Sequence, residues 1–90
     1  MKIKERFIVR KIAEHYMAVP LGHTAMSHHG LVALNETAAF LWKHLQENHH
    51  TIESLAAVLM QEYDSAKEDA VQTVTHFCEK LSQDGYLERV

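Results

Sequence analysis

The chain has 90 residues, 47% of them apolar and 23% charged, which suits one small domain with a thin core and no deep substrate cleft. No apolar run reaches the roughly 18 residues of a membrane span, and the lysines near the N-terminus precede no apolar signal segment. The single cysteine, Cys78, excludes an internal disulfide and favours a reducing compartment. We therefore expect a single cytoplasmic domain over residues 1–90 with no membrane partner.

The formal net charge of −3 is unevenly distributed along the chain. Residues 1–13 carry five basic side chains and one acidic one, whereas residues 14–90 carry four basic and eleven acidic ones. Charge on an edge strand discourages pairing with other chains, so we interpret the basic segment as a solvated edge strand. Attraction of an acidic partner is the alternative.

The first half of the chain has the pattern of three short strands. Residues 7–13 and 16–20, rich in β-branched and aromatic side chains, predict an antiparallel pair, and Pro20 and Gly22 end the second strand. Residues 30–34 form a third apolar run that leads directly into a helix, which excludes a long catalytic loop between the two elements.

Three helices are predicted in the second half. Asn35 is a strong cap for a helix over about 35–47, and Thr51 caps one over about 52–63. Ser65 and Glu68 match a capping box at the start of a helix over about 66–84, which Gly85 ends. The order of elements predicts an α+β fold in which a three-stranded antiparallel sheet precedes a three-helix bundle.

The sequence has no pattern typical of a metal, cofactor or catalytic site. Its eight histidines include no pair spaced by four residues on one helix, and no Cys-x-x-Cys accompanies them. The carboxylates Glu68 and Asp69 lie in a first helical turn, where the helix dipole stabilises them. Cys78 occupies a routine apolar position of its helix. We expect no metal, no cofactor and no enzymatic activity.

Several short segments stand in a specific order and spacing along the chain. They are Val9-Arg-Lys-Ile-Ala13, Val19-Pro-Leu-Gly22, Leu34-Asn-Glu-Thr-Ala38, Leu41-Trp42, Thr51-Ile-Glu-Ser-Leu55, Tyr63 and Phe77-Cys-x-x-Leu81-x-x-x-Gly85-Tyr-Leu87. Together they resemble the PqqD family over roughly residues 7–88. The sequence departs from the family pattern at Thr73, where an aspartate is common, and at Glu14, which replaces a usual glycine. The resemblance implies a peptide chaperone, often called a RiPP recognition element. Such a module binds the leader of a ribosomally made precursor peptide and presents it to a modifying enzyme, commonly a radical S-adenosylmethionine enzyme.

If the resemblance holds, the leader adds an antiparallel strand beside the third strand, in a groove whose other wall is the last helix. On that helix we expect the flank next to Val74 that includes Cys78 to line the groove. The candidate peptide-binding residues are His29, Gly30, Leu31, Val32, Ala33, Leu34, Val71, Val74, Thr75 and Cys78.

A winged helix-turn-helix DNA-binding regulator is the alternative, because three short helices with flanking strands also describe that fold. The outer face of its recognition helix, over about 66–84, would carry three acidic and two basic side chains. Contacts to phosphates dominate DNA affinity, so this balance disfavours nucleic acid as a partner.

Overall fold

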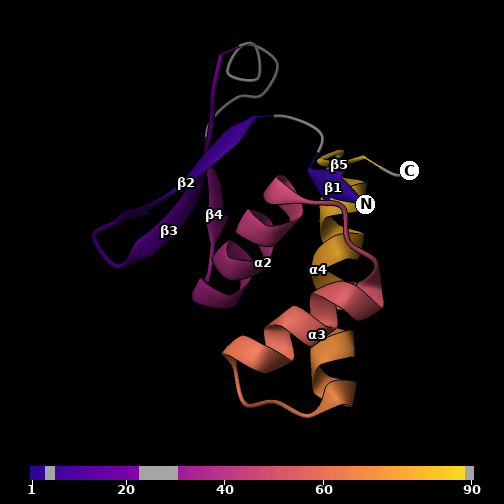
Figure 1. Cartoon of the computed structure of the whole chain (residues 1–90). Helices are drawn as coiled ribbons and strands as arrows, with labels where there is room; N and C mark the ends of the chain where they lie inside the picture. Colours follow the sequence, from indigo (N-terminus) through magenta and orange to yellow (C-terminus); the bar gives the residue numbers. More distant parts are fainter. Residues whose placement is uncertain (4–5, 23–30, 89–90) are drawn as a thin grey trace.

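The computed structural model describes residues 1–3, 6–22 and 31–88 (Figure 1). Three strands precede three helices, and two further short strands pair near the chain ends. The elements are β1 (Lys2–Ile3), β2 (Phe7–Ile12), β3 (His15–Pro20), β4 (Val32–Leu34), α2 (Glu36–Glu47), α3 (Ile52–Glu62), α4 (Lys67–Gln83) and β5 (Leu87–Glu88). The predicted α+β class is confirmed, and the main strands and helices begin and end within two residues of the ranges expected from the sequence.

The three-stranded sheet is antiparallel with the order β2-β3-β4. β4 pairs with β3 in the register Tyr16↔Leu34, Met17↔Ala33 and Ala18↔Val32. Within the described parts of the chain, no strand pairs with the other side of β4. β4 therefore leaves a row of backbone groups at an open edge of the sheet.

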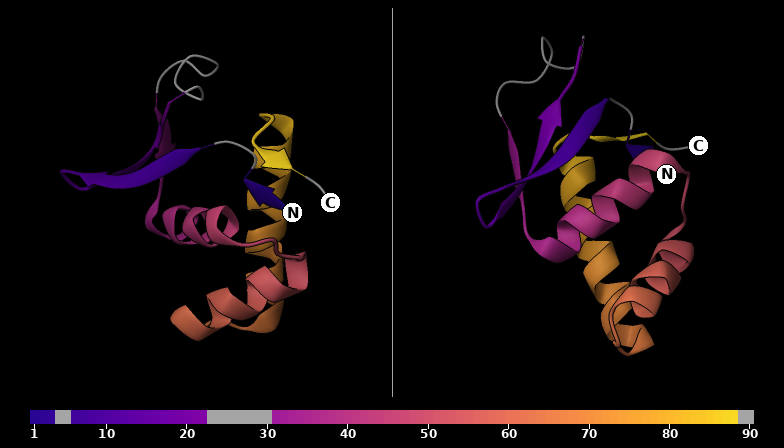
Figure 2. Two further views of the ribbon diagram at one scale, coloured as in Figure 1. Left: turned by 45° about the horizontal axis from the view of Figure 1, so that its top comes forward. Right: turned by 60° about the vertical axis from the view of Figure 1, so that its left-hand side comes forward.

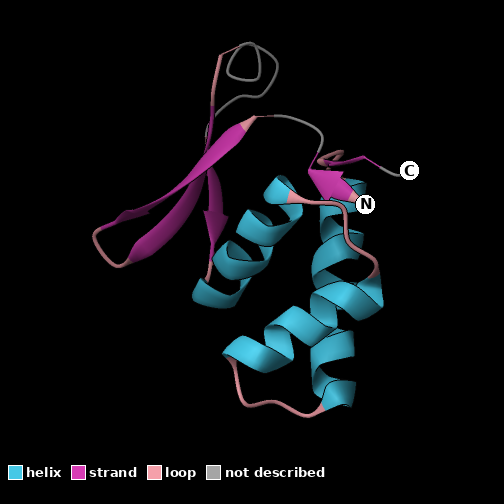
Figure 3. Cartoon of the chain, viewed as in Figure 1, coloured by secondary structure: helices cyan, strands magenta, loops and turns pink. Residues whose placement is uncertain are grey.

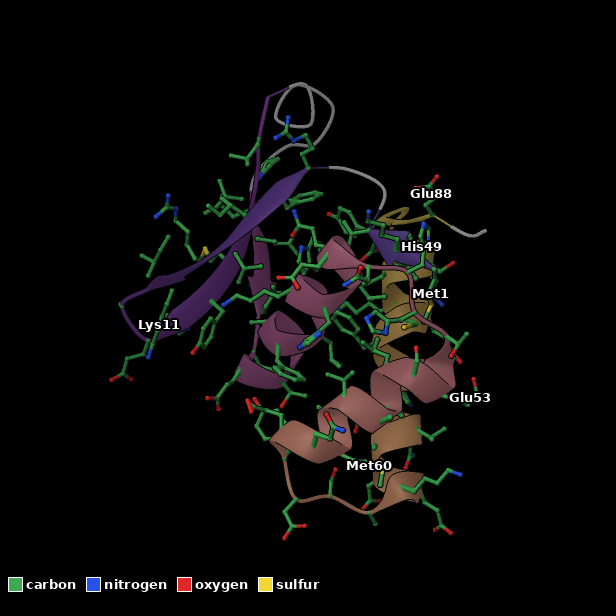
Figure 4. All side chains as sticks on the ribbon, in the orientation of Figure 1. Met1, Lys11, His49, Glu53, Met60 and Glu88 are labelled. Atoms are coloured by element: carbon green, nitrogen blue, oxygen red, sulfur yellow. The ribbon has the colours of Figure 1, made fainter. Side chains whose placement is uncertain are left out.

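β2 forms the opposite edge of this sheet and carries part of the basic N-terminal segment. Arg10 and Lys11 are exposed on it, and the Lys11 ammonium lies 5.7 Å from the centre of the Tyr16 ring. Figure 4 shows Lys11 near the tip of the β2–β3 hairpin, away from the helices. This basic charge lies on an edge strand, as the first interpretation of the segment expects.

The hairpin between β2 and β3 turns through Ala13 and Glu14, because Ile12 pairs with His15. Ala13 has φ +57°, in the left-handed region that glycine adopts at little cost. We expect Ala13→Gly to raise the free energy of unfolding by about 0.5–1 kcal/mol, the left-handed penalty of alanine less the added freedom of glycine in the unfolded chain. Urea denaturation measures this change. A loss of stability would contradict the turn geometry.

The helices α2, α3 and α4 lie on one side of the sheet (Figure 3). The inner face of the sheet packs on α2, where Leu41, Trp42 and Leu45 are fully buried. The Phe7 ring meets Trp42 edge-on, with ring centres 5.1 Å apart. The side chain of Gln46 accepts a hydrogen bond from the Trp42 indole and donates one to the Phe7 carbonyl, so the indole N–H buried in this core has a partner.

Two of the three helix starts are capped as predicted. Asn35 Oδ1 accepts a hydrogen bond from the Ala38 N–H at 2.7 Å. Thr51 and Ser54 form a capping box, in which each side chain accepts from the other residue's N–H.

The predicted capping box of Ser65 and Glu68 is wrong. α4 begins one residue later than that box requires, with Ala66 as its cap residue and no side-chain cap bond. The Ser65 hydroxyl is instead buried with no hydrogen-bond partner among the described residues.

A two-stranded pairing near the chain ends was not predicted from the sequence. β1 and β5 are antiparallel, with Ile3 opposite Leu87 and Lys2 opposite Glu88. Figure 2 shows both strands beside the end of α4, and Figure 4 places Met1 and Glu88 in the same region. Met1 and Leu87 of this region lie beside the Cys78 side of α4, and another side of the helix faces β4.

We expect the protonation of His50 to make the stability of the fold depend on pH. Its Nδ1 lies 3.0 Å from the Ser54 hydroxyl, and its Nε2 is buried without a partner among the described residues. Burial, then the neighbouring His44 and the terminal ammonium, lower the pKa of His50 from its ordinary value of 6.5.

Because the unfolded chain protonates His50 at higher pH than the folded chain does, we expect the free energy of unfolding to fall as pH drops below about 6.5. In His50→Asn this part of the pH dependence should be absent. Urea denaturation of both proteins between pH 5 and pH 8 measures it. Identical pH profiles would contradict the assignment.

Candidate functional site

A groove of about 620 Å³ lies between β4 and α4, with the start of α2 contributing to its lining. On one side are residues 31–34, which include the open edge strand. On the other are six residues of α4 and the turn that follows it: Thr73, His76, Phe77, Lys80, Leu81 and Asp84. The volume is in the range of protein ligand sites.

The helical wall follows from the period of α4. Thr73, His76, Phe77, Lys80 and Asp84 recur at intervals of three and four residues, which places them on one face of the helix. The core side chains of the same helix are centred on Val74, about one quarter turn away. The groove therefore lies along the boundary between the buried stripe and the exposed face of α4.

The groove combines an apolar interior with a polar rim. Leu41 and Leu81 are buried, and Val32, Leu34 and Phe77 are half-buried, so apolar surface lines the inner part. The rim consists of exposed polar side chains on α4, namely Thr73, His76, Lys80 and Asp84. Leu31, at the start of the β4 wall, is 51% exposed. Such a groove can hold an extended chain that has apolar side chains on one face.

Of the predicted site residues, the described ones on the strand line the groove and those on the helix do not. Leu31, Val32, Ala33 and Leu34 all line the groove. His29 and Gly30 lie outside the described residues. Val74 is fully buried and belongs to the core.

The flank of α4 predicted from the sequence does not line this groove. Thr75 and Cys78 lie on a separate shallow pocket shared with Met1, His50 and Leu87, among others. Val71 packs against the core and does not line the groove. The two flanks of the Val74 stripe are equivalent by helical angle, and the β1–β5 pair, which sequence patterns did not reveal, occupies the side chosen from the sequence.

The groove residues of α4 were missed as candidate peptide contacts. By helical period alone, Thr73, His76 and Lys80 lie on the outer face of this helix and Phe77 at the border of its buried stripe. Phe77 carried a usable signal. A large aromatic side chain at the border of a core stripe often packs one end of its ring in the core and leaves the other end accessible to a binding site.

Cys78 should be chemically inert in the folded chain. Burial raises the pKa of its thiol to about 11, from an ordinary value of 9.0, with the terminal ammonium opposing part of the shift. We expect alkylation by iodoacetamide at pH 8 to be about 100-fold slower than in denaturant, because so little thiolate is present. Mass spectrometry follows the reaction. A native rate equal to the denatured rate would contradict burial of the thiol.

The described residues contain no group of three histidine, cysteine or acidic side chains arranged to hold a metal ion. In the same residues, no helix is both long and apolar enough to cross a membrane.

The fold and the groove define a small α+β domain in which an open strand edge faces a helix across a partly apolar groove. The family model described as coenzyme PQQ synthesis protein D (PqqD) matches residues 22–87, and the chain belongs to the PqqD family.

Among solved structures, TbiB1 in complex with the TbiA(beta) leader peptide is similar in fold, with a TM-score of 0.72. The match covers 100% of this chain and 98% of TbiB1 at 18% sequence identity. No curated protein matches the chain significantly in sequence.

Proposed function

We propose that this protein binds the leader segment of a ribosomally made precursor peptide as an added antiparallel strand on β4. The observation that carries the proposal is the open edge of β4 beside a groove lined by apolar side chains. Main-chain hydrogen bonds to such an edge demand little of the peptide sequence, and pockets for alternate side chains select it.

Membership of the PqqD family supports this function, and so does the fold shared with TbiB1, a protein solved with a leader peptide bound. In the proposed function the chain is a cytoplasmic peptide chaperone. It presents the leader to a radical S-adenosylmethionine enzyme or another peptide-modifying enzyme and itself catalyses no reaction. The Cys78 thiol is buried and lies outside the groove, which supports a binding role for the protein and not nucleophilic catalysis by this thiol.

The proposal does not include a nucleic-acid partner. The exposed surface of α4 carries Glu68, Asp69, Glu79 and Asp84 against Lys67 and Lys80. An excess of carboxylates repels phosphates, which supply most of the affinity of DNA-binding helices.

Calorimetric titration tests the function with two ligands, the leader of a candidate precursor peptide and a duplex DNA of similar length. We expect saturable one-to-one binding of the leader, and DNA binding no tighter than about 100 μM at physiological salt. Sub-micromolar, steeply salt-dependent DNA binding, or a complete lack of heat with the leader, would contradict the proposal.

A further inference from the structure

Lys80 and Asp84, the lysine and the aspartate on the helical wall of the groove, have a fixed order relative to β4. In Figures 1 and 2, β4 runs towards the start of α2, whereas α4 runs in the opposite direction, towards β5. A leader strand antiparallel to β4 therefore runs in the same direction as α4. Its N-terminal part lies near Thr73 and its C-terminal part near Asp84.

Lys80 and Asp84 have a spacing that a strand can match. Four residues of helix advance by about 6 Å along the axis. Two residues of strand advance by about 6.7 Å, and alternate side chains of a strand point to the same face. Two leader residues at positions i and i+2, both facing α4, can therefore lie opposite Lys80 and Asp84 in turn.

The position of Asp84 is not explained by the stability of the helix. It is the exposed C-cap residue of α4, where a negative charge opposes the helix dipole. Lys80, one turn earlier, is favoured by that dipole. Among the described residues, neither side chain forms an ion pair with the other or with a third group, so both charges are available at the groove rim.

We propose that the groove selects leaders in which an acidic residue is followed two positions later by a basic one. The acidic side chain lies opposite Lys80 and the basic side chain opposite Asp84. The inference rests on the proposed function, because it assumes a leader strand on β4, and it adds the charge pattern that the strand must carry. Complementary charges at the rim of an interface determine register and exclude wrong partners more than they add affinity.

A display library of random 12-residue peptides, selected on the purified full chain, tests the pattern. We expect the selected peptides to be enriched in an acidic residue two positions before a basic one. The double variant Lys80→Asp with Asp84→Lys, which keeps the net charge, should select the reverse order. The matched control is Lys43→Glu with Glu47→Lys, which makes the same exchange on an exposed face of α2 outside the groove and should keep the original order.

Titration of one selected peptide completes the test. Exchanging its acidic and basic residues should weaken binding to the natural chain about tenfold and restore it on the Lys80/Asp84 double variant. Selected peptides with no charge order, or with the same order on both proteins, would overturn this inference and leave the proposed function standing. If the natural chain selects no peptide, that result would contradict both the charge pattern and the proposed function.

Discussion

Of the two variants Val32→Pro and Ala33→Pro, we expect one to lose stability and the other to remain folded but lose affinity for the leader. Successive N–H groups of a strand point to opposite edges, so one of the two residues donates towards β3 and the other towards the open edge of β4. The variant that loses the inward donor should be destabilised by about 2–4 kcal/mol. The other should remain folded and bind the leader at least tenfold more weakly, about 1.4 kcal/mol.

Thermal melts and calorimetric titrations of both variants measure the two effects. The matched control is the pair Val9→Pro and Arg10→Pro on β2, the opposite edge of the same sheet. Whichever of these two stays folded should bind the leader normally. A folded β4 variant with unchanged affinity would show that the leader does not pair with this edge.

Leu41→Ala and Leu55→Ala should both cost about 2–5 kcal/mol of stability, a large share of the total for a domain of this size. Both side chains have 0% exposure, so each change leaves a cavity in the core. Only Leu41 also lines the groove, whereas Leu55 lies on α3 away from it.

The leader should consequently bind more weakly to folded Leu41→Ala, because the cavity lies directly beneath the inner wall of the groove and lets that wall relax. Folded Leu55→Ala should bind it with the affinity of the natural chain. Urea denaturation gives the stabilities, and titration at low temperature, where both variants are folded, gives the affinities. Equal losses of affinity in the two variants would indicate a general effect of destabilisation and contradict the position of the groove.

The sequence predicted the fold well because its local signals agree with one another. The caps at Asn35 and Thr51 each act within a single helix, where local patterns determine structure. The strand wall of the groove followed from the same reasoning, since the apolar run at residues 31–34 leads directly into a capped helix.

The helical wall could not be predicted in this way, because its position depends on contacts between distant segments. β1 and β5 are each two residues long, too short to show alternation, yet they cover the Cys78 side of α4 and leave the Lys80 side to the groove. Helical angle alone placed Thr75 and Phe77 on two equivalent flanks of Val74. Tertiary packing distinguishes the two flanks.

The central claim, strand addition on β4 within the groove, is tested most directly by titrating leader peptide into the ¹⁵N-labelled chain and following its backbone amides by NMR. We expect shifts and slowed hydrogen exchange at residues 31–34, shifts along the α4 face from Thr73 to Asp84, and cross-strand contacts between the leader backbone and β4. The amide signals of Thr75 and Cys78, on the other flank of α4, should shift little. Perturbations confined to β2 or to the Cys78 flank of α4, with β4 unchanged, would contradict the claim.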